Sequence, residues 1–239
     1  MMNDIYKDGS YHEHDTTWHE EDSPWKASQI ARIIKSNNLQ PSTVCEIGCG
    51  AGGILQCLYD DLGDDIVFTG YEVSPQAYEM CRSKTKHNMT FVLEDLLTVD
   101  QPTLDLILAI DVFEHVEDYL GFLKRLRPKA TNHIFHIPLD MSVQSVFRVT
   151  PFMRARHSVG HLHYFSKETA LATLEHAGYE IVDYFYTRGA LELPKRDWKA
   201  GLLRVPRSLL YKLCPDMAAR LLGGFSLMVL TKYPCSIAH

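Results

Sequence analysis

A glycine-rich turn after a short apolar strand constrains the fold of this chain more than any other feature of its sequence. Residues 43–47 have the apolar character of a strand, and four glycines follow them: Gly48, Gly50, Gly52 and Gly53. Glycine adopts positive φ angles at little cost and lets a ligand approach the backbone closely. The free N–H groups of a helix that begins there suit a nucleotide-like ligand. The spacing satisfies both G-x-G-x-x-G and G-x-G-x-G, so the glycines alone do not identify the ligand.

Strands and helices alternate along the rest of the chain, which is typical of an α/β protein. Strands are predicted at 43–47, 65–71, 90–93, 105–110, 133–137, 181–187 and 225–231. Helices are predicted at 54–62, 76–87, 119–126 and 167–177, and another begins with Ser23 as its cap and ends at Asn37. Because five of the seven strands are joined by helical crossovers, we expect a doubly wound, mostly parallel sheet with an antiparallel last strand.

The chain is expected to form a single domain, 1–239, with additions around the sheet. Its 239 residues are 46% hydrophobic and 23% charged, which supports a sizeable core. Residues 1–40 are predicted to form an N-terminal cap segment and a helix. The stretches 139–165 and 188–224 are long for loops, and both follow strand ends, where ligands bind in open α/β sheets. We therefore expect both of them to form a substrate lid.

Composition also limits the partners and the location of the protein. The net charge of −6 does not favour a nucleic-acid partner. The longest near-continuous apolar run, Leu221 to Leu230, is too short to cross a bilayer, and the first residues lack the pattern of a signal peptide. None of the six cysteines forms a C-x-x-C pair, so we expect reduced thiols. The expectation is a cytoplasmic protein without a transmembrane segment, in which peripheral membrane contact and oligomeric state stay open.

Three carboxylates at successive strand ends favour a cationic ligand over a diphosphate. Glu46 lies two residues before the first glycine, where a pyrophosphate would need room and an ammonium group would be favoured. Glu72 ends the second strand, where a carboxylate can accept hydrogen bonds from two ribose hydroxyls. Asp95 follows the third strand and is placed for an adenine amino group. Together they suit an amino acid joined through a sulfonium to adenosine. The other interpretation of each acid is a helix cap or a surface charge.

The combined motifs resemble the class I S-adenosylmethionine-dependent methyltransferases over roughly residues 41–187. The resemblance rests on four segments: the glycine turn with Glu46, the pair Tyr71-Glu72, residues 94–96 and residues 105–116. The last of these segments ends in Glu-His-Val and is similar to the ubiquinone/menaquinone-biosynthesis branch. The resemblance implies a seven-stranded sheet with an antiparallel last hairpin, S-adenosylmethionine as the cofactor, and methyl transfer.

The resemblance also implies the cofactor-binding residues of this chain. They are Glu46, Gly48, Gly50, Gly52, Glu72, Asp95, Leu96 and Asp111. Asp111 is expected to contact the methionine portion or the substrate, whereas Glu114 is expected to face water. Residues 11–25 are expected to fold over the cofactor, because Tyr11, Trp18 and Trp25 supply apolar cover.

Methyl transfer requires an aligned and deprotonated acceptor, and histidines are the candidate bases. His136 ends the fifth strand, on the side of the donor methyl, and His161 and His163 follow in the first insertion. The predicted catalytic residues are His136, His161 and Asp111. The alternative for His161 and His163 is a packing motif or a satisfied polar pair. No metal site is expected, because no third ligand stands at a recognisable spacing from these two histidines.

The two halves of the chain differ in charge, which bears on the acceptor. Residues 1–120 carry 7 Lys/Arg and 22 Asp/Glu, and residues 121–239 carry 17 and 8. The basic residues of the two insertions would form a cationic roof over the site, with Arg154 and Arg156 in contact with the acceptor. We therefore expect the methyl acceptor to be an oxygen of an anionic metabolite, such as a phosphorylated or nucleotide-linked sugar. The alternatives are a lipid-like or quinone-type acceptor at a membrane surface and a non-catalytic binding module. An NAD-dependent oxidoreductase is the least favoured.

Overall fold

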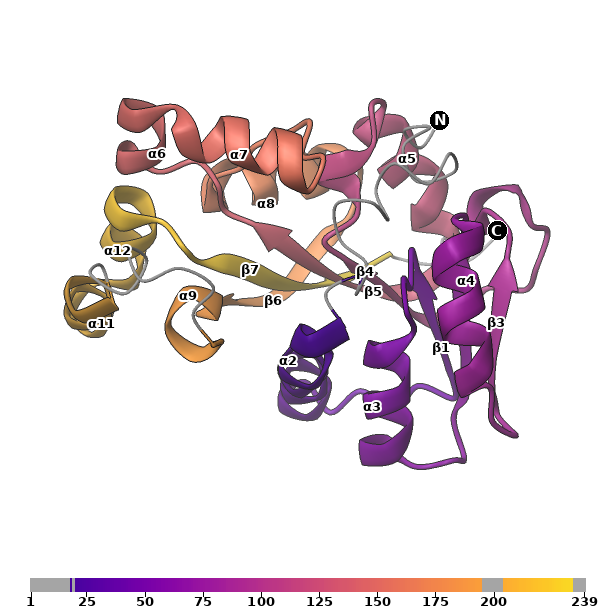
Figure 1. Cartoon of the computed structure of the whole chain (residues 1–239). Helices are drawn as coiled ribbons and strands as arrows, with labels where there is room; N and C mark the ends of the chain where they lie inside the picture. The colour runs from indigo at the N-terminus through magenta and orange to yellow at the C-terminus, as the bar shows by residue number, and fades with distance from the viewer. Residues whose placement is uncertain (1–17, 19, 195–203, 234–239) are drawn as a thin grey trace.

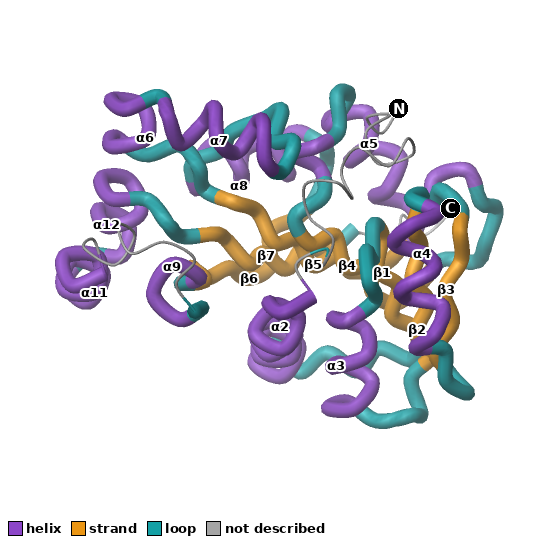
Figure 2. The backbone as a smooth tube through the Cα atoms, in the orientation of Figure 1, coloured by secondary structure: helices purple, strands orange, loops and turns teal. Residues whose placement is uncertain are grey.

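A seven-stranded sheet forms the centre of the molecule, in the order β3-β2-β1-β4-β5-β7-β6 (Figure 2). The computed structural model describes residues 18, 20–194 and 204–233. The strands are β1 (Thr43–Ile47), β2 (Val67–Glu72), β3 (Met89–Leu93), β4 (Leu104–Ile110), β5 (Ala130–Pro138), β6 (Glu180–Thr187) and β7 (Ser226–Lys232). The pairs among β1 to β5 are parallel, and β7 runs antiparallel to β5 and β6. The predicted fold class is confirmed.

Helices cover both faces of this sheet (Figure 1). The α-helices are α2 (Ser23–Ser36), α3 (Gly53–Leu62), α4 (Pro75–Cys81), α5 (Tyr119–Leu126), α6 (Val143–Arg148), α7 (Thr150–Ser158), α8 (Lys167–His176), α9 (Gly189–Glu192), α11 (Arg204–Leu213) and α12 (Pro215–Leu222). Single 3-10 turns are η2 (Glu20–Asp22), η3 (Arg82–Lys84), η4 (Leu96–Thr98), η5 (Phe113–His115) and η6 (Arg127–Lys129). One core joins α2, α3 and α4 to the sheet, and a second core joins α5 and α8 to its other face.

The central strand β4 shows why its sequence is apolar throughout. Ile107 and Ala109 belong to the core beneath α5 and α8, whereas Leu106 and Leu108 belong to the core beneath α2 and α3. All four side chains are fully buried. A strand covered on both faces loses the alternation of apolar and polar residues that a half-exposed strand shows.

Several predicted boundaries differ from the structure. Ser23 is already the first residue of α2, and Asp22 occupies the cap position without a side-chain capping bond. The helix predicted to reach residue 87 ends at Cys81 and is followed by the 3-10 turn η3. It stops because Lys86 exchanges backbone hydrogen bonds with Met89, which starts the pairing that leads into β3.

Both predicted insertions contain helices. The stretch 139–165 holds α6 and α7, and 188–224 holds α9, α11 and α12. Three basic residues of the second stretch lie outside the described residues: Lys195, Arg196 and Lys199. Tyr11 and the other residues before Trp18 also lie outside them. Across 20–194 and 204–233, no helix combines the length and the apolar character that spanning a membrane would need.

Candidate active site

The glycine turn between β1 and α3 adopts the backbone geometry that its sequence predicts. Gly48, Gly50 and Gly52 have φ angles of 68°, 53° and 77°, a region that other residues rarely adopt. Gly52 is also closely packed, because a Cβ atom there would lie 2.7 Å from Phe91 and 2.8 Å from Cys81. The turn therefore needs glycine at this position both for conformation and for space.

A cavity of about 330 Å³ lies beside this turn, at the carboxyl ends of β1, β2, β4 and β5. These strands are parallel, so their carboxyl ends share one edge of the sheet, where open α/β folds bind ligands. The cavity wall brings together seven of the residues that the sequence assigned to the site: Glu46, Gly48, Gly50, Glu72, Asp111, His136 and His161.

Three other assigned residues do not line this cavity. Gly52 caps the start of α3. The carboxylate of Asp95 accepts a hydrogen bond of 2.9 Å from the Leu97 N–H and so caps η4, and the side chain of Leu96 is fully buried in the core. Their contacts with a cofactor stay predictions.

Glu46 brings a buried carboxylate to the cavity. Its side chain is 2% exposed, and its Oε2 atom has no hydrogen-bond partner among the described residues. Burial raises the pKa of Glu46 well above its ordinary value, and the charge of Lys26 opposes that shift. An unpaired buried carboxylate is costly, so the cavity favours a positively charged ligand group beside Glu46.

Glu72 is held rigidly against the glycine turn. Its Oε2 accepts a hydrogen bond of 2.8 Å from the Gly50 N–H, and its Oε1 accepts bonds of 2.8 Å from the N–H groups of Val73 and Ser74. Burial raises the pKa of Glu72, and these three backbone bonds oppose the shift. Oε2 accepts only one of these bonds and keeps a further lone pair, so the group can also accept a hydrogen bond from a ligand hydroxyl.

Asp111 is the centre of a charged network at the end of β4. Its carboxylate contacts Lys26 Nζ at 2.7 Å and His136 Nδ1 at 2.6 Å. Burial disfavours the ionised form, but His136 and Lys26 together hold the pKa of Asp111 below its ordinary value. The φ angle of Asp111 is 54°, and strained backbone of this kind concentrates at functional sites. The network supports a role for Asp111 in positioning a ligand.

Lys26 was missed by sequence reasoning. It lies on α2, 85 positions before Asp111, so no local pattern joins the two residues. The available signal is that Lys26 is the one basic residue between Asp8 and Ala31, in an otherwise acidic stretch.

His136 lies at the predicted strand end, and both of its ring nitrogens are engaged. Nδ1 pairs with Asp111, and Nε2 lies 2.9 Å from the hydroxyl of Thr187 at the end of β6. A ring that is 3% exposed and bonded at both nitrogens is better suited to orienting Asp111 than to taking a proton directly from an acceptor. Its assignment as a base stays a prediction.

His161 and His163 have different surroundings, although only one residue separates them. His161 is buried on the cavity wall, and its Nδ1 lies 2.6 Å from Asp140. His163 packs against Tyr119 and pairs with the carbonyl of Val116 at 2.9 Å. Of the two predicted candidates, His161 alone reaches the cavity.

The expectation that Glu114 faces water is wrong. Glu114 is 1% exposed, because η5 turns its side chain inward immediately after β4. The backbone carbonyl of Glu114 accepts hydrogen bonds from the N–H groups of Leu162 and His163. The first insertion therefore lies against η5 and brings His161 to Glu114.

Two tryptophans cover the cavity from the N-terminal side. Trp18 and Trp25 both line it, and Trp18 also packs over Gly50. Trp25 donates a hydrogen bond of 2.8 Å from Nε1 to Glu192 on α9, and its ring meets His136 edge-on. The second insertion and α2 thus meet above the same cavity.

Arg154 and Arg156 are not part of the cavity wall. Both are exposed on α7, and Arg154 lines a separate hollow with Met153 and His157. The structure gives no direct contact between these arginines and the main cavity, so their predicted contact with an acceptor stays untested.

The sequence of residues 18–184 matches the protein family described as "Methyltransferase domain". A 2-methyl-6-phytyl-1,4-hydroquinone methyltransferase from Synechocystis sp. is 29% identical over 89 residues, which cover 36% of this chain. The match spans only 27% of the length of that curated relative.

Solved structures with the same fold cover nearly the whole chain. One is the complex between the Trm112 methyltransferase activator of Haloferax volcanii and a methyltransferase, with a TM-score of 0.67, 17% identity and 100% of both chains covered. Another is the N-methyltransferase NodS of Bradyrhizobium japonicum WM9 in complex with S-adenosyl-L-homocysteine, with a TM-score of 0.62 and 17% identity over 95% of this chain and 97% of NodS. At these identities the likeness is one of fold.

Proposed function

The chain belongs to the class I S-adenosylmethionine-dependent methyltransferases, and from that premise we propose that its cavity binds S-adenosylmethionine and transfers the methyl group to an oxygen of a small-molecule acceptor. The observation that carries the proposal is the pair of buried carboxylates, Glu46 and Glu72, on the wall beside the glycine turn. A cationic amino acid and a ribose satisfy these two groups, and a diphosphate would be repelled by them.

Each carboxylate has its own proposed partner on the cofactor. Glu46 pairs with the ammonium group, since one of its buried oxygens lacks a partner within the protein. Glu72 accepts a hydrogen bond from a ribose hydroxyl through Oε2, because backbone amides already fix its orientation. Asp111, held by Lys26 and His136, faces the methionine portion. The sulfonium charge then lies among carboxylates, which favours binding of the charged cofactor.

The acceptor occupies the part of the cavity that extends toward His161. That wall is formed by Pro138, Val159 and His161, beyond the Asp111 network. Methyl transfer joins an acceptor oxygen to the methyl carbon while the bond from carbon to sulfur breaks, and the sulfur keeps the electron pair. The chain contributes alignment of the two reactants and exclusion of water by Trp18 and Trp25.

A lipid-like acceptor is favoured over a free anionic metabolite by the surface around the lid. Helix α12 contacts both α6 and α11 at one end of the molecule, and α6 contacts α7 (Figure 1). They expose large apolar side chains, with Phe147 90%, Leu209 61% and Leu213 76% exposed. Residues 143–158 and 204–222 carry seven Lys/Arg and one Asp, and all of these Lys/Arg except the buried Arg207 are exposed. Apolar and basic side chains on exposed helices suit an anionic membrane surface.

Transfer of labelled methyl groups tests this function. The full chain is incubated with methyl-labelled S-adenosylmethionine and with extracts of the organism that encodes it, separated into lipid-soluble and water-soluble fractions. We expect label in the lipid-soluble fraction, on oxygen by mass spectrometry of the product. Label confined to the water-soluble fraction would support an anionic metabolite instead, and no transfer to either fraction would favour a non-catalytic binding module.

A Glu46→Gln variant is the internal control for the same reactions. The substitution keeps the shape of the side chain and removes the carboxylate charge, so we expect weaker cofactor binding with the fold intact. Transfer at an unchanged rate and unchanged cofactor KM would remove Glu46 from the cofactor site.

A further inference from the structure

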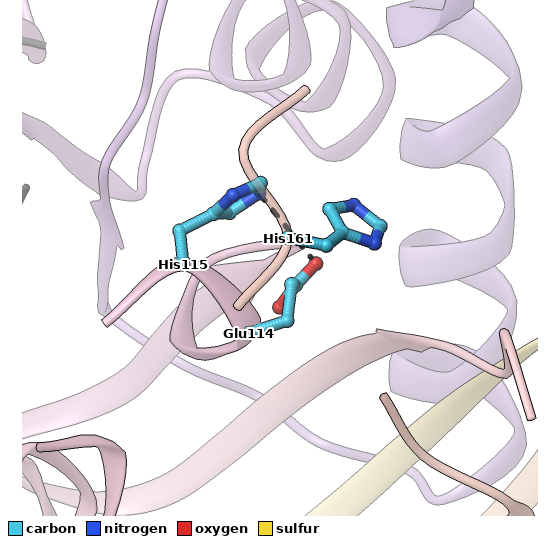
Figure 3. A group of neighbouring side chains, drawn as sticks. All are labelled: Glu114, His115 and His161. Atoms are coloured by element: carbon cyan, nitrogen blue, oxygen red, sulfur yellow. Dashed lines mark ion pairs between the residues drawn. The ribbon is translucent and has the colours of Figure 1, made fainter. Parts of the chain in front are cut away.

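Glu114, His115 and His161 form a compact cluster on the acceptor side of the cavity (Figure 3). Glu114 and His115 come from η5, and His161 comes from the segment that follows α7. One nitrogen or oxygen from each side chain lies within 4.8 Å of the other two. His115 and His161 both line the cavity, so the cluster borders the space proposed for the acceptor.

The carboxylate of Glu114 is the unexplained group of this cluster. It is 1% exposed, and neither of its oxygens has a hydrogen-bond partner among the described residues. His115 Nε2 lies 3.8 Å from Oε1, which is too long for a hydrogen bond. An ionised carboxylate that is buried without a partner is costly unless a cation joins it.

His161 is oriented in the way that metal ligands usually are. Its Nδ1 lies 2.6 Å from the carboxylate of Asp140, which leaves Nε2 as the ligand atom. Histidines that bind metals almost always donate their second ring N–H to a carboxylate, a carbonyl or a water. The ring of His115 meets that of His161 edge-on, with centroids 4.9 Å apart. The orienting bond and the unpartnered carboxylate are independent observations that point to the same ligand.

We propose that Glu114, His115 and His161 bind one divalent transition-metal ion, with an open coordination position toward the cavity. Two imidazoles and one carboxylate are a donor set that zinc, manganese, iron and cobalt accept, whereas magnesium and calcium prefer oxygen ligands alone. Three protein ligands leave a position for water or substrate, as in catalytic sites.

The open position gives the ion a role in the reaction, and this role rests on the proposed function. An acceptor hydroxyl that binds there becomes more acidic, and its proton leaves to water. The oxygen then forms its bond to the methyl carbon as the bond from carbon to sulfur breaks. A metal at this place also explains how an acceptor is activated although both nitrogens of His136 are engaged.

The test measures metal content and affinity, without an acceptor. Tag-free full-length protein is stripped with a chelator and desalted, then titrated separately with zinc and manganese, and retained metal is counted per chain. We expect one tightly held equivalent in the wild type. Glu114→Gln and His161→Ala should lose it, and Asp140→Asn should weaken binding by about tenfold to 100-fold. His157→Ala, which removes an exposed histidine of α7, should retain it.

Two results would overturn the metal site: no retained metal in the wild type, or equal retention in the wild type, Glu114→Gln and His161→Ala. Circular dichroism of each variant establishes that it is folded. Glu114→Gln is the more conservative of the two substitutions, because it preserves the shape of the side chain and His161→Ala does not. Binding of S-adenosylhomocysteine in the same samples separates the two hypotheses. Cofactor binding without metal refutes the metal site alone, and metal without cofactor binding refutes the proposed function alone.

Discussion

At the scale of single residues, the site depends on carboxylates that the backbone holds in place. Glu72 is the clearest case, because three N–H groups fix its two oxygens before any ligand binds. The side chain of Glu72 therefore loses little conformational freedom when it accepts a hydrogen bond from a ligand hydroxyl. Hydrogen bonds to a fixed, charged carboxylate are strong for this reason.

Replacing Glu72 with alanine is expected to weaken binding of S-adenosylhomocysteine by about 1.5–3 kcal/mol, the range for losing charge-assisted hydrogen bonds. Isothermal titration calorimetry measures the change. Glu79→Ala is the matched control, because Glu79 is an exposed carboxylate on α4 that pairs with Arg82. Unchanged affinity in Glu72→Ala would remove Glu72 from the site.

Comparing two glycines with positive φ angles distinguishes the cost of backbone strain from the cost of steric crowding. Gly52 has a φ of 77° and close neighbours, whereas Gly63 has a φ of 98° with nothing within 4 Å of its added Cβ. We expect Gly63→Ala to lower the free energy of unfolding by about 1–2 kcal/mol and Gly52→Ala by roughly a further 1–3 kcal/mol. Urea unfolding gives both values, and equal losses would show that the turn tolerates a side chain at Gly52.

At the scale of secondary-structure elements, the helices of the two insertions have two roles. The segments that follow α7 and α9 reach the cavity through His161 and Leu193, and the outer sides of the helices expose apolar and basic residues. This division of roles gives a prediction for the outer surface that is independent of the site.

The Phe147→Ser variant is expected to bind vesicles rich in phosphatidylglycerol about 10- to 150-fold more weakly than the wild type, since burying a phenylalanine side chain contributes about 1.5–3 kcal/mol. Sedimentation with vesicles measures binding, and vesicles of phosphatidylcholine alone should bind the wild type weakly. Val67→Ser is the control, because Val67 is exposed on β2, away from these helices. Equal binding of the Phe147→Ser variant and the wild type would leave α6 without a membrane role.

Local sequence patterns predicted the strands and the glycine turn. They could not predict contacts between residues that are distant in the sequence. Strand β1 was predicted with its observed bounds, because apolar residues followed by glycines are a local signal. The cluster of Glu114 with His161 depends on a contact across 47 positions, formed when the first insertion returns to η5. The burial of Glu114 follows from that contact, so its sequence position at a strand end suggested a surface charge instead.

At the scale of the whole molecule, the charge asymmetry of the chain agrees with its two proposed surfaces. The acidic half supplies Glu46, Glu72 and Asp111 to the cavity, and the basic half supplies the helices around the lid. Opposite potentials of this kind affect encounter rates more than final affinity.

The N-terminal helix is expected to respond to the cofactor as part of the whole fold. Trp18 and Trp25 line the cavity, so bound S-adenosylhomocysteine should slow amide hydrogen exchange in peptides that begin near Trp18 and continue into α2. Mass spectrometry of exchanged peptides measures this. Peptides from α8 serve as the reference, because α8 packs on the other face of the sheet. Equal exchange near Trp18 with and without ligand would contradict its role as a cover.

The ligand of the cavity distinguishes a methyltransferase from a nicotinamide-dependent oxidoreductase, and calorimetric titration of the purified full chain measures it directly. S-adenosylhomocysteine and NAD⁺ are titrated separately, and each is then titrated in the presence of the other. The buried carboxylate of Glu46, beside the glycine turn, predicts that S-adenosylhomocysteine binds one site per chain and that NAD⁺ neither binds nor displaces it. Binding of NAD⁺ at this site, with no heat from S-adenosylhomocysteine, would contradict the assignment of the cavity.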